Sequence, residues 1–382
     1  MSDVSLIRCS SYDREVVEDA VRQAVDQLGG MSAMVHPGER VLIKPNLLHA
    51  MSPKRAVTTH PSVLAAVIRL VKEAGAVPFV GDSSGMPLYE RVLRATGVRS
   101  VAEELGAEIV DFTAEACEVE NADGVRVKRL VLSKAVVEAD KLISLPKLKT
   151  HGQVYFTGAI KNQLGCVPGL LKAQYHFRFP DRDLFAGALL DINRYLKPKA
   201  ILAIMDGVVA MEGNGPSGGD PRDVGVIIAG REFPAVDVVA CRVVNIEPMT
   251  VPTTRLAYET GFIEGDIGAI RVLGAQVEDV IVRDFKRLRV VANVGRMGPM
   301  PKFISARISA SLVPKPAPDK ELCTLCGVCV EACPAVPKAI ELTDRGIVIN
   351  YDRCIRCYCC QEMCPSGAMK LRSGLLARLL NR

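Results

Sequence analysis

The chain has 382 residues, 49% of them hydrophobic and 24% charged, with a formal net charge of +5, so it is long enough for more than one domain and a sizeable core. No run approaches eighteen uncharged apolar residues and no apolar segment follows a basic amino terminus, so neither a membrane span nor a signal peptide is expected. The 13 cysteines, without an export signal, predict a reducing, low-oxygen cytoplasm.

Apolar strands alternate with amphipathic helices through residues 1–297, which we expect to form one domain. This alternation predicts an α/β fold with a mostly parallel, doubly wound sheet. Residues 117–132 are typical of an antiparallel hairpin that turns at Asp123-Gly124. The expected strands are 4–8, 40–43, 77–80, 108–112, 141–145, 200–205 and 224–229, and the expected helices are 13–28, 61–74, 88–95, 99–105 and 183–195.

Polar residues follow four of these strands, at the point where each strand is expected to end. They lie at 44–46, 81–85, 146–151 and 206–216. Ligands of open α/β sheets bind outside the carboxyl ends of the strands, so these segments are expected to converge on one rim. The sequence therefore predicts a binding site on this rim.

The chemistry of this site follows from its residue types. Lysines, histidines and glycines crowd residues 147–176, and cations beside exposed backbone N–H groups favour an anionic ligand, a carboxylate or a phosphate. His151 is the best candidate for proton transfer. The predicted catalytic residues are His151, Lys147, Lys161 and Glu212, and the predicted substrate-binding residues are Lys44, Asn46, Asp82, Lys149, Asn162 and Asp206.

Several of these residues have plainer interpretations. Lys44 and Asn46 alternatively close a turn, Asp82 caps a helix, and Glu212 pairs with a surface lysine. Cys166 is expected to be a buried apolar residue. The sequence has no G-x-x-x-x-G-K-[ST] loop and no G-x-G-x-x-G turn after the first strand, so neither a Walker-type ATPase nor an ordinary dinucleotide fold is indicated.

A proline-rich linker is expected at 298–318, and after it the pattern C-x2-C-x2-C-x3-C-P occurs twice. This spacing is typical of ferredoxins with two 4Fe-4S clusters, in which the fourth cysteine of each run ligates the other cluster. Paired CxxC zinc sites lack the third cysteine and the proline, and a disulfide framework is typical of short secreted chains. The predicted ligands are Cys323, Cys326, Cys329 and Cys364 for cluster 1, and Cys354, Cys357, Cys360 and Cys333 for cluster 2.

Residues 319–370 are thus expected to form a small α+β, two-cluster ferredoxin-like domain with a hairpin at 340–351. Cys359 is not expected to be a ligand. Leucines on one helical face predict an amphipathic tail at 371–382, docked on its own body or on a partner or membrane surface. Each oxidised cluster with four thiolates carries a charge of about −2, which offsets the positive formal charge, so no nucleic-acid partner is indicated.

A series of short motifs carries a family resemblance. The motifs are Lys44-Pro45-Asn46, Gly81-Asp82, Lys147 to His151, Lys161-Asn162 with Gly165, Met211-Glu212-Gly213 with Gly215-Pro216, and Asp237. With them the chain resembles the family called domain of unknown function 362 over about residues 4–290, and members of that family often carry a carboxyl-terminal two-cluster ferredoxin module, as here. The resemblance implies an iron-sulfur protein of anaerobic or facultative microbes and specifies no substrate.

Together these features predict an iron-sulfur redox protein that reduces an anionic small molecule at the rim and exchanges electrons with a donor or acceptor protein. One alternative is a ferredoxin-like electron carrier or adaptor, whose rim docks a partner enzyme. Another is a non-redox enzyme with structural or sensing clusters. A deep pocket at the rim beside a cluster favours the reductase, whereas a flat rim far from both clusters favours the carrier.

Overall fold

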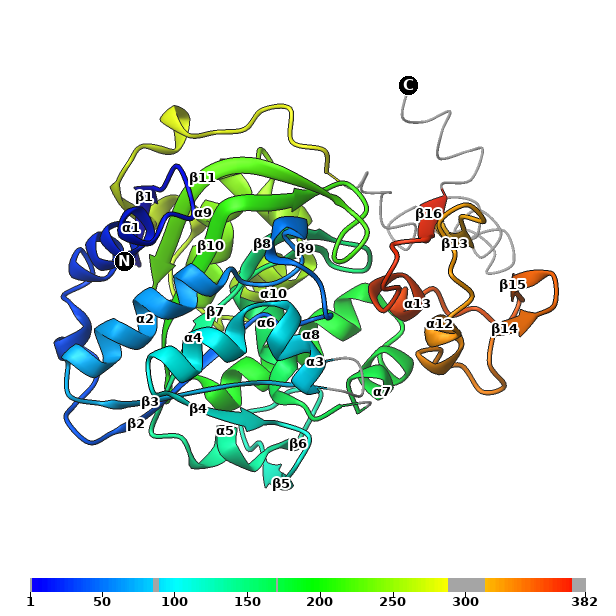
Figure 1. Cartoon of the computed structure of the whole chain (residues 1–382), viewed down its shortest axis with the longest axis horizontal. Helices are drawn as coiled ribbons and strands as arrows, with labels where there is room; N and C mark the ends of the chain where they lie inside the picture. The colour runs from blue at the N-terminus through cyan, green and yellow to red at the C-terminus, as the bar shows by residue number, and fades with distance from the viewer. Residues whose placement is uncertain (1, 85–88, 170, 288–312, 373–382) are drawn as a thin grey trace.

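The computed structural model describes residues 2–84, 89–169, 171–287 and 313–372. A large mixed sheet runs through the first part of the chain, in the strand order β12-β1-β11-β10-β7-β2-β3-β4 (Figure 1). The strands from β10 through β7, β2 and β3 to β4 are parallel, whereas β11 pairs antiparallel with β1 and β10. The strands are β1 (Asp3–Arg8), β2 (Arg40–Pro45), β3 (Val77–Asp82), β4 (Glu108–Asp111), β7 (Lys141–Leu145), β10 (Ala200–Glu212), β11 (Asp220–Gly230) and β12 (Arg271–Gly274).

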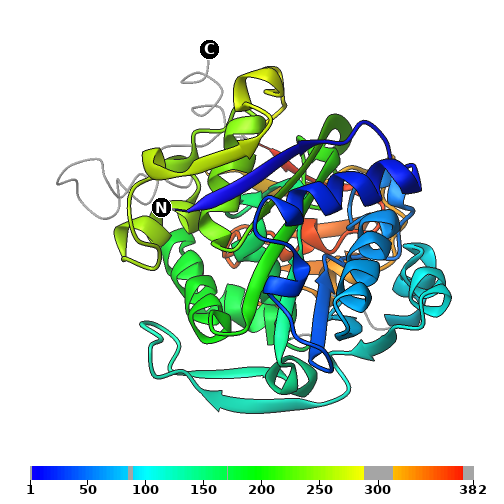
Figure 2. The same cartoon turned by 90° about the vertical axis from the view of Figure 1, so that its left-hand side faces the viewer.

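Helices cover both faces of this sheet because successive strand residues point to opposite sides. In β2, Val41 and Ile43 pack into one apolar layer with α1 and α2, whereas Leu42 packs into the other with α8 and α9. Figure 2 shows the blue helices on one side of the sheet and the green helices on the other. The helices of this part are α1 (Arg14–Asp26), α2 (Pro61–Glu73), α3 (Tyr89–Ala95), α4 (Val98–Glu104), α5 (Lys134–Glu138), α6 (Ala159–Asn162), α7 (Leu171–Arg178), α8 (Arg182–Leu196), α9 (Phe233–Val243) and α10 (Pro252–Glu259).

The prediction of an α/β fold with a large, mostly parallel sheet is thereby confirmed. The expected hairpin at 117–132 is also present, as β5 (Ala116–Glu120) paired antiparallel with β6 (Arg129–Ser133). These two strands form a separate sheet beside the main one.

The segment 146–151, expected as a loop, is a strand. It forms β8 (Lys147–His151), which pairs in parallel with β10 and antiparallel with β9 (Tyr155–Thr157). The reason is that β10 does not end near Met205 but continues through a bulge after Gly207 to Glu212, which provides β8 with a partner. With Leu148 as its only apolar residue, this segment carries no apolar alternation that predicts a strand.

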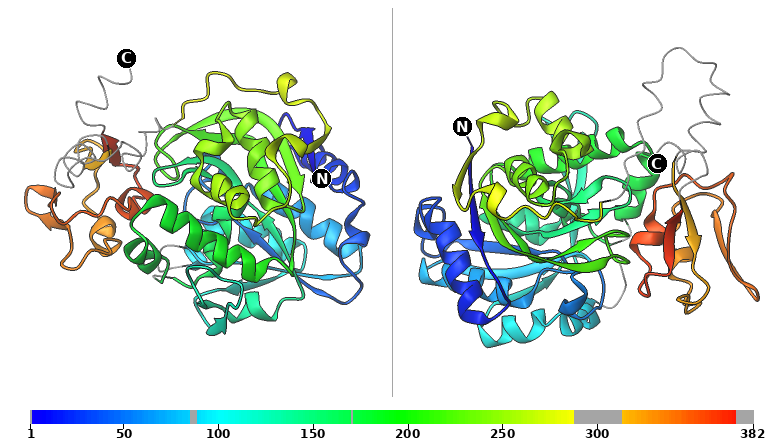
Figure 3. Two further views of the ribbon diagram at one scale, coloured as in Figure 1. Left: turned by 180° about the vertical axis from the view of Figure 1, so that it is seen from behind. Right: turned by 90° about the horizontal axis from the view of Figure 1, so that it is seen from above.

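A small second body holds the eight predicted cluster cysteines and lies against one end of the large sheet (Figure 3). Its elements are β13 (Lys315–Pro318), α12 (Val328–Glu331), β14 (Ile340–Thr343), β15 (Gly346–Ile349), α13 (Cys359–Glu362) and β16 (Met369–Arg372). The hairpin expected at 340–351 is present as β14 and β15. We call the described residues 313–372 the cluster module.

The end of the predicted linker, 315–318, forms β13, which pairs antiparallel with β16. Prolines are tolerated there because both strands of a two-stranded sheet are edges. The predicted tail at 371–382 is wrong at its start, because Leu371 and Arg372 belong to β16. Residues 373–382 of that tail and residues 298–312 of the predicted linker lie outside the described residues.

Candidate functional site

A cavity of about 100 Å³ lies where the carboxyl ends of β2 and β3 meet β8, the α6 turn, α7 and the cluster module. Most of the predicted site residues line it, namely Lys44, Asn46, Asp82, Lys149, His151, Lys161 and Asn162. The cavity therefore gathers all four polar segments that the sequence placed on one rim, the fourth only through Pro216.

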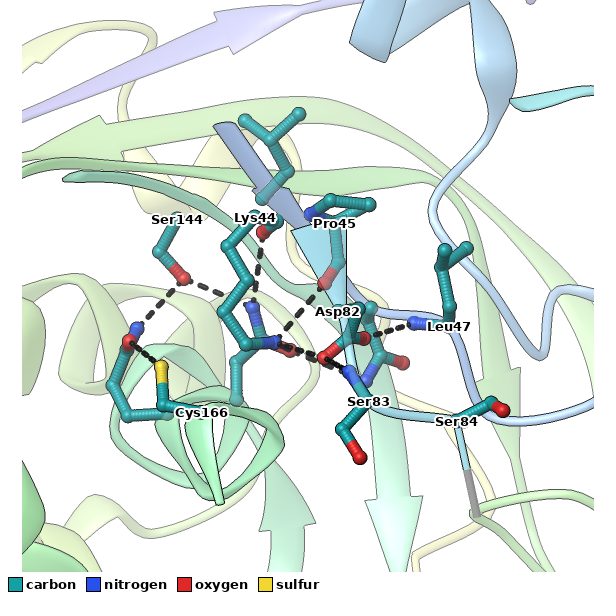
Figure 4. Close-up of polar contacts among 12 residues, drawn as sticks. Lys44, Pro45, Leu47, Asp82, Ser83, Ser84, Ser144 and Cys166 are labelled. Carbon is teal, nitrogen blue, oxygen red and sulfur yellow. Dashed lines mark hydrogen bonds and ion pairs between the residues drawn. The ribbon is translucent and has the colours of Figure 1, made fainter. Parts of the chain in front are cut away.

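Lys44 and Asp82 form a buried ion pair in the wall of the cavity, with 2.8 Å between Nζ and Oδ1 (Figure 4). Asp82 also accepts hydrogen bonds from the backbone N–H groups of Leu47 and Ser83, at 2.7 and 2.8 Å. These partners offset the cost of burying both charges. Gly165 lies against the pair so closely that a Cβ there would come within 2.5 Å of Lys44 Nζ, so a side chain at this position would separate the two charges.

Two further lysines face the cavity without a carboxylate partner among the described residues. Lys149 is buried and donates to the carbonyl of Val57 at 2.6 Å. Lys172 is partly buried and donates to Ser83 Oγ at 3.0 Å and to the carbonyl of Ser84 at 3.2 Å. Burial lowers the pKa of Lys149 to about 7 and that of Lys172 to about 8. A nearby anion would stabilise the charged form of both lysines.

The cluster module contributes an anion to the same cavity through Glu362, at the end of α13. Its Oε2 lies 3.4 Å from His151 Nε2, and its Oε1 lies 3.6 Å from Lys161 Nζ. Burial alone would raise the pKa of Glu362, but Lys161 and His151 hold it well below its usual range. Glu362 is therefore a carboxylate held between a lysine and a histidine of the α/β part.

The tautomer of His151 follows from its neighbours. Its Nδ1 accepts hydrogen bonds from the backbone N–H groups of Gln153 and Val154, at 3.1 and 3.3 Å. The proton of the neutral ring is thus on Nε2, the nitrogen that faces Glu362 and the cavity. Burial lowers the pKa of His151, so the neutral form with Nε2–H is favoured.

Sequence reasoning missed two residues that bring the cluster module to the cavity. Glu362 has no motif of its own, and His49, three residues after Asn46, donates from Nε2 to the carbonyl of Glu362 at 2.7 Å. Lys172 and His176 also line the cavity. The sequence indicated them only as part of the segment 147–176, which is rich in lysines, histidines and glycines. A pairing across more than 300 residues leaves no local signal in a single sequence.

Three predicted site residues lie away from this cavity. Lys147 pairs with Asp206, with 2.7 Å between Nζ and Oδ2, and both are fully buried. Tyr12 completes the group, since its hydroxyl lies 2.7 Å from both Asp206 Oδ1 and Lys147 Nζ. Glu212, at the end of β10, accepts from the backbone N–H of Lys286 at 2.9 Å. These residues hold the β8–β10 region together rather than face the cavity.

The cysteines of the cluster module are arranged in two groups. Cys329 lies near Cys364, Cys326 and Cys323, and burial together with these neighbours raises its pKa to about 11. None of the 13 cysteines of the chain is paired in a disulfide bond. This first group has the composition predicted for cluster 1.

The second group contains Cys354, whose pKa is raised by burial and by the neighbouring Cys357 and Cys333. Burial raises the pKa of Cys360, and so do the neighbouring Cys357, Cys354, Cys329 and Cys333. The neighbours of Cys354 are residues predicted for cluster 2, and the number of clusters and the assignment of each thiol stay predictions.

Comparison with known proteins bears on both parts of the chain. The sequence model described as "Domain of unknown function (DUF362)" matches residues 41–242, more than half of the chain. The chain belongs to the DUF362 family. A model of the 4Fe-4S dicluster domain matches residues 315–365 of this DUF362 protein, which supports iron-sulfur cluster binding by the cluster module.

A thylakoid-associated protein of Synechocystis is 39% identical to the DUF362 protein over 254 residues, which cover 66% of this chain and 78% of that relative. No helix within the described residues is both long and apolar enough to cross a bilayer. The predicted cytoplasmic location stays a prediction.

Two solved structures resemble the chain more distantly. One is the lactate racemase apoprotein of Thermoanaerobacterium thermosaccharolyticum, at 14% identity and a TM-score of 0.38, covering 61% of this chain and about half, 54%, of the racemase. The other is a structural-genomics protein of Thermotoga maritima, at 13% identity and a TM-score of 0.36, covering 65% of this chain and 59% of that protein. Similarity at this level carries no functional argument.

Proposed function

We propose that this DUF362 protein is an iron-sulfur oxidoreductase that reduces a small anionic molecule in the cavity. The observation that carries the proposal is the cavity wall formed by the cluster module. Ala332, Cys359 and Met363 line the cavity, and each is the chain neighbour of a predicted cluster ligand, Cys333, Cys360 and Cys364 in turn. The Cα atoms of chain neighbours are about 3.8 Å apart, so a molecule in the cavity would lie beside the iron-sulfur centres.

A cavity at this place, instead of a flat docking rim, supports a reductase over a carrier. Each 4Fe-4S cluster, when bound, exchanges one electron. The chain itself must then hold the substrate and supply protons. A reduction by two electrons takes up two protons. The ammonium of Lys161 can donate one of them and water the other, whereas the neutral ring of His151 donates only a hydrogen bond from Nε2.

Ligand binding is assigned to Lys149 and Lys172, because these ammonium groups lack a counter-charge. A buried ammonium without an anionic partner is costly, and an incoming carboxylate or phosphate relieves that cost. Thr157 supplies a further polar contact, since its buried Oγ1 has no hydrogen-bond partner among the described residues. The cavity therefore suits a compact anion that also carries a hydrogen-bonding group.

The first test measures anion binding with sulfate as the probe. Replacing Lys149 or Lys172 by methionine is expected to weaken sulfate binding by about tenfold or more, because each charge-assisted contact contributes roughly 1.5–3 kcal/mol. Isothermal titration of the anaerobic holoprotein gives the affinity. The matched control is Lys54→Met, since Lys54 is an exposed lysine outside the cavity. Wild-type affinity in both cavity variants would contradict an anion site at these lysines.

The reduction itself is tested by reoxidation of the clusters. Dithionite-reduced holoprotein is mixed with small carboxylates and phosphorylated compounds, and the visible absorbance of the clusters is followed. We expect faster reoxidation with at least one anion, and loss of that acceleration in the Lys149→Met variant. Reoxidation at the same rate with every compound would favour the electron carrier.

Sulfate affinity is also expected to depend on pH. Burial depresses the pKa values of Lys149 and Lys172 to about 7 and about 8, and a bound anion raises them again, so binding takes up protons. Affinity is therefore highest below about pH 7 and falls as the pH rises, by at most about tenfold per unit for each lysine. Titrations in steps across this range, in which sulfate keeps its charge, measure the slope. A flat profile would contradict the role of the lysines.

A further inference from the structure

The carboxylate of Glu362 sits in the cavity although the cluster module is anchored by other groups. Gln361 donates from Nε2 to the carbonyls of Gly215 and Asn214, at 2.7 and 2.9 Å. Ser217 Oγ donates to the carbonyl of Gln361 at 3.1 Å, and His49 holds the carbonyl of Glu362. These contacts join the Gln361 side chain and two backbone carbonyls of the module to His49 and to the turn between β10 and β11, so docking has anchors other than the Glu362 side chain.

The position of Glu362 divides the cations of the cavity into two sets. Lys161 and His151 each face one of its carboxylate oxygens. Lys149 and Lys172 bond only to carbonyl and hydroxyl oxygens among the described residues. Lys161 and His151 thus already have a carboxylate partner, whereas Lys149 and Lys172 have none among the described residues.

We propose that Glu362 is a built-in carboxylate ligand of the cavity, which occupies the subsite of Lys161 and His151 and leaves Lys149 and Lys172 for the bound molecule. The inference rests on the proposed anion site and adds a specificity rule to it. A ligand binds with a single anionic group, because a second one directed at Lys161 would meet the fixed charge of Glu362. Glu362 is therefore a residue that determines specificity and is supplied by the cluster module.

The test removes this carboxylate and replaces it from solution. In Glu362→Ala the side chain is lost, and the space beside Lys161 and His151 has the size of a small carboxylic acid. Glu362→Ala is expected to lower the melting temperature of the anaerobic holoprotein. Sodium acetate is expected to reverse at least half of this decrease, whereas sodium chloride at equal ionic strength reverses none of it. In Glu362→Gln the subsite stays filled, so acetate is expected to have no such effect. Glu321→Ala, which removes an exposed glutamate of the same module, is the matched control.

If Glu362→Ala does not fold, the sulfate affinity of Glu362→Gln tests the inference instead. Glu362→Gln keeps the shape and removes one negative charge from the cavity, so its sulfate affinity is expected to rise by about tenfold or more. Iron and acid-labile sulfide content shows that the clusters are retained. Unchanged sulfate affinity in Glu362→Gln, or equal rescue of Glu362→Ala by acetate and chloride, would overturn the inference.

The two proposals fail in different ways. If sulfate binds the wild type through Lys149 and Lys172 but acetate does not rescue Glu362→Ala, only the role of Glu362 is wrong. If replacing Lys149 or Lys172 leaves the sulfate affinity unchanged, the proposed anion site is wrong. A crystal structure of Glu362→Ala with acetate between Lys161 and His151 would show the subsite directly.

Discussion

Replacing Lys147 by methionine is expected to lower the free energy of unfolding by about 3–5 kcal/mol. The substitution leaves Asp206 as a buried charge without its ammonium partner at 2.7 Å, and both side chains are essentially inaccessible to solvent. Tyr12 and the backbone N–H of His60 still donate to the Asp206 carboxylate, but neither carries a compensating charge. Urea unfolding of the anaerobic holoprotein measures the loss.

Two further variants test whether the loss of stability in Lys147→Met comes from the unpaired charge of Asp206. Lys147→Met combined with Asp206→Asn is expected to recover part of the stability, because the unpaired charge is gone. Lys54→Met, at an exposed lysine, is expected to change stability by about 0.5 kcal/mol or less. If Lys147→Met has wild-type stability but reduces substrate more slowly, Lys147 is instead a catalytic residue, as predicted from the sequence.

Replacing Cys333 by serine is expected to reduce the iron and acid-labile sulfide from about eight to about four atoms of each per chain. The expectation follows from the predicted crossed arrangement, which assigns Cys333 to cluster 2, and Cys333 is one of the neighbours that raise the pKa of Cys354. Cluster 2 would then lose a ligand while cluster 1 keeps all of its own. Metal analysis and electron paramagnetic resonance of the reduced protein count the clusters.

Cys359→Ser is the matched control for this experiment. Cys359 is buried beside Cys360 and lines the cavity, but it occupies an x position of the second C-x2-C-x2-C-x3-C run and not one of the four ligand positions. Its replacement is expected to leave the iron content unchanged. Loss of iron in Cys359→Ser, or full iron content in Cys333→Ser, would show that the ligand assignment is wrong.

The sequence alone was sufficient for features that depend on local spacing. Short continuous apolar runs predicted strands such as β2 and β7, which are buried on both faces. The 3.6-residue period predicted α1 and α2, and both kinds of pattern lie within one element. The spacing of the cysteines was enough to indicate the clusters for the same reason, since one short loop supplies three of the four ligands of each cube.

Tertiary structure decided which of the charged residues share a site. Lys147 and Lys149 are two residues apart and looked equivalent in the sequence, yet Asp206 and Tyr12 hold Lys147 in a buried network while Lys149 faces the cavity. Glu362 lies among cluster cysteines, and its role depends on Lys161 and His151, about 200 residues earlier in the chain. The electrostatic partner of a buried charge is set by packing between distant segments, and no periodicity within one segment reveals it.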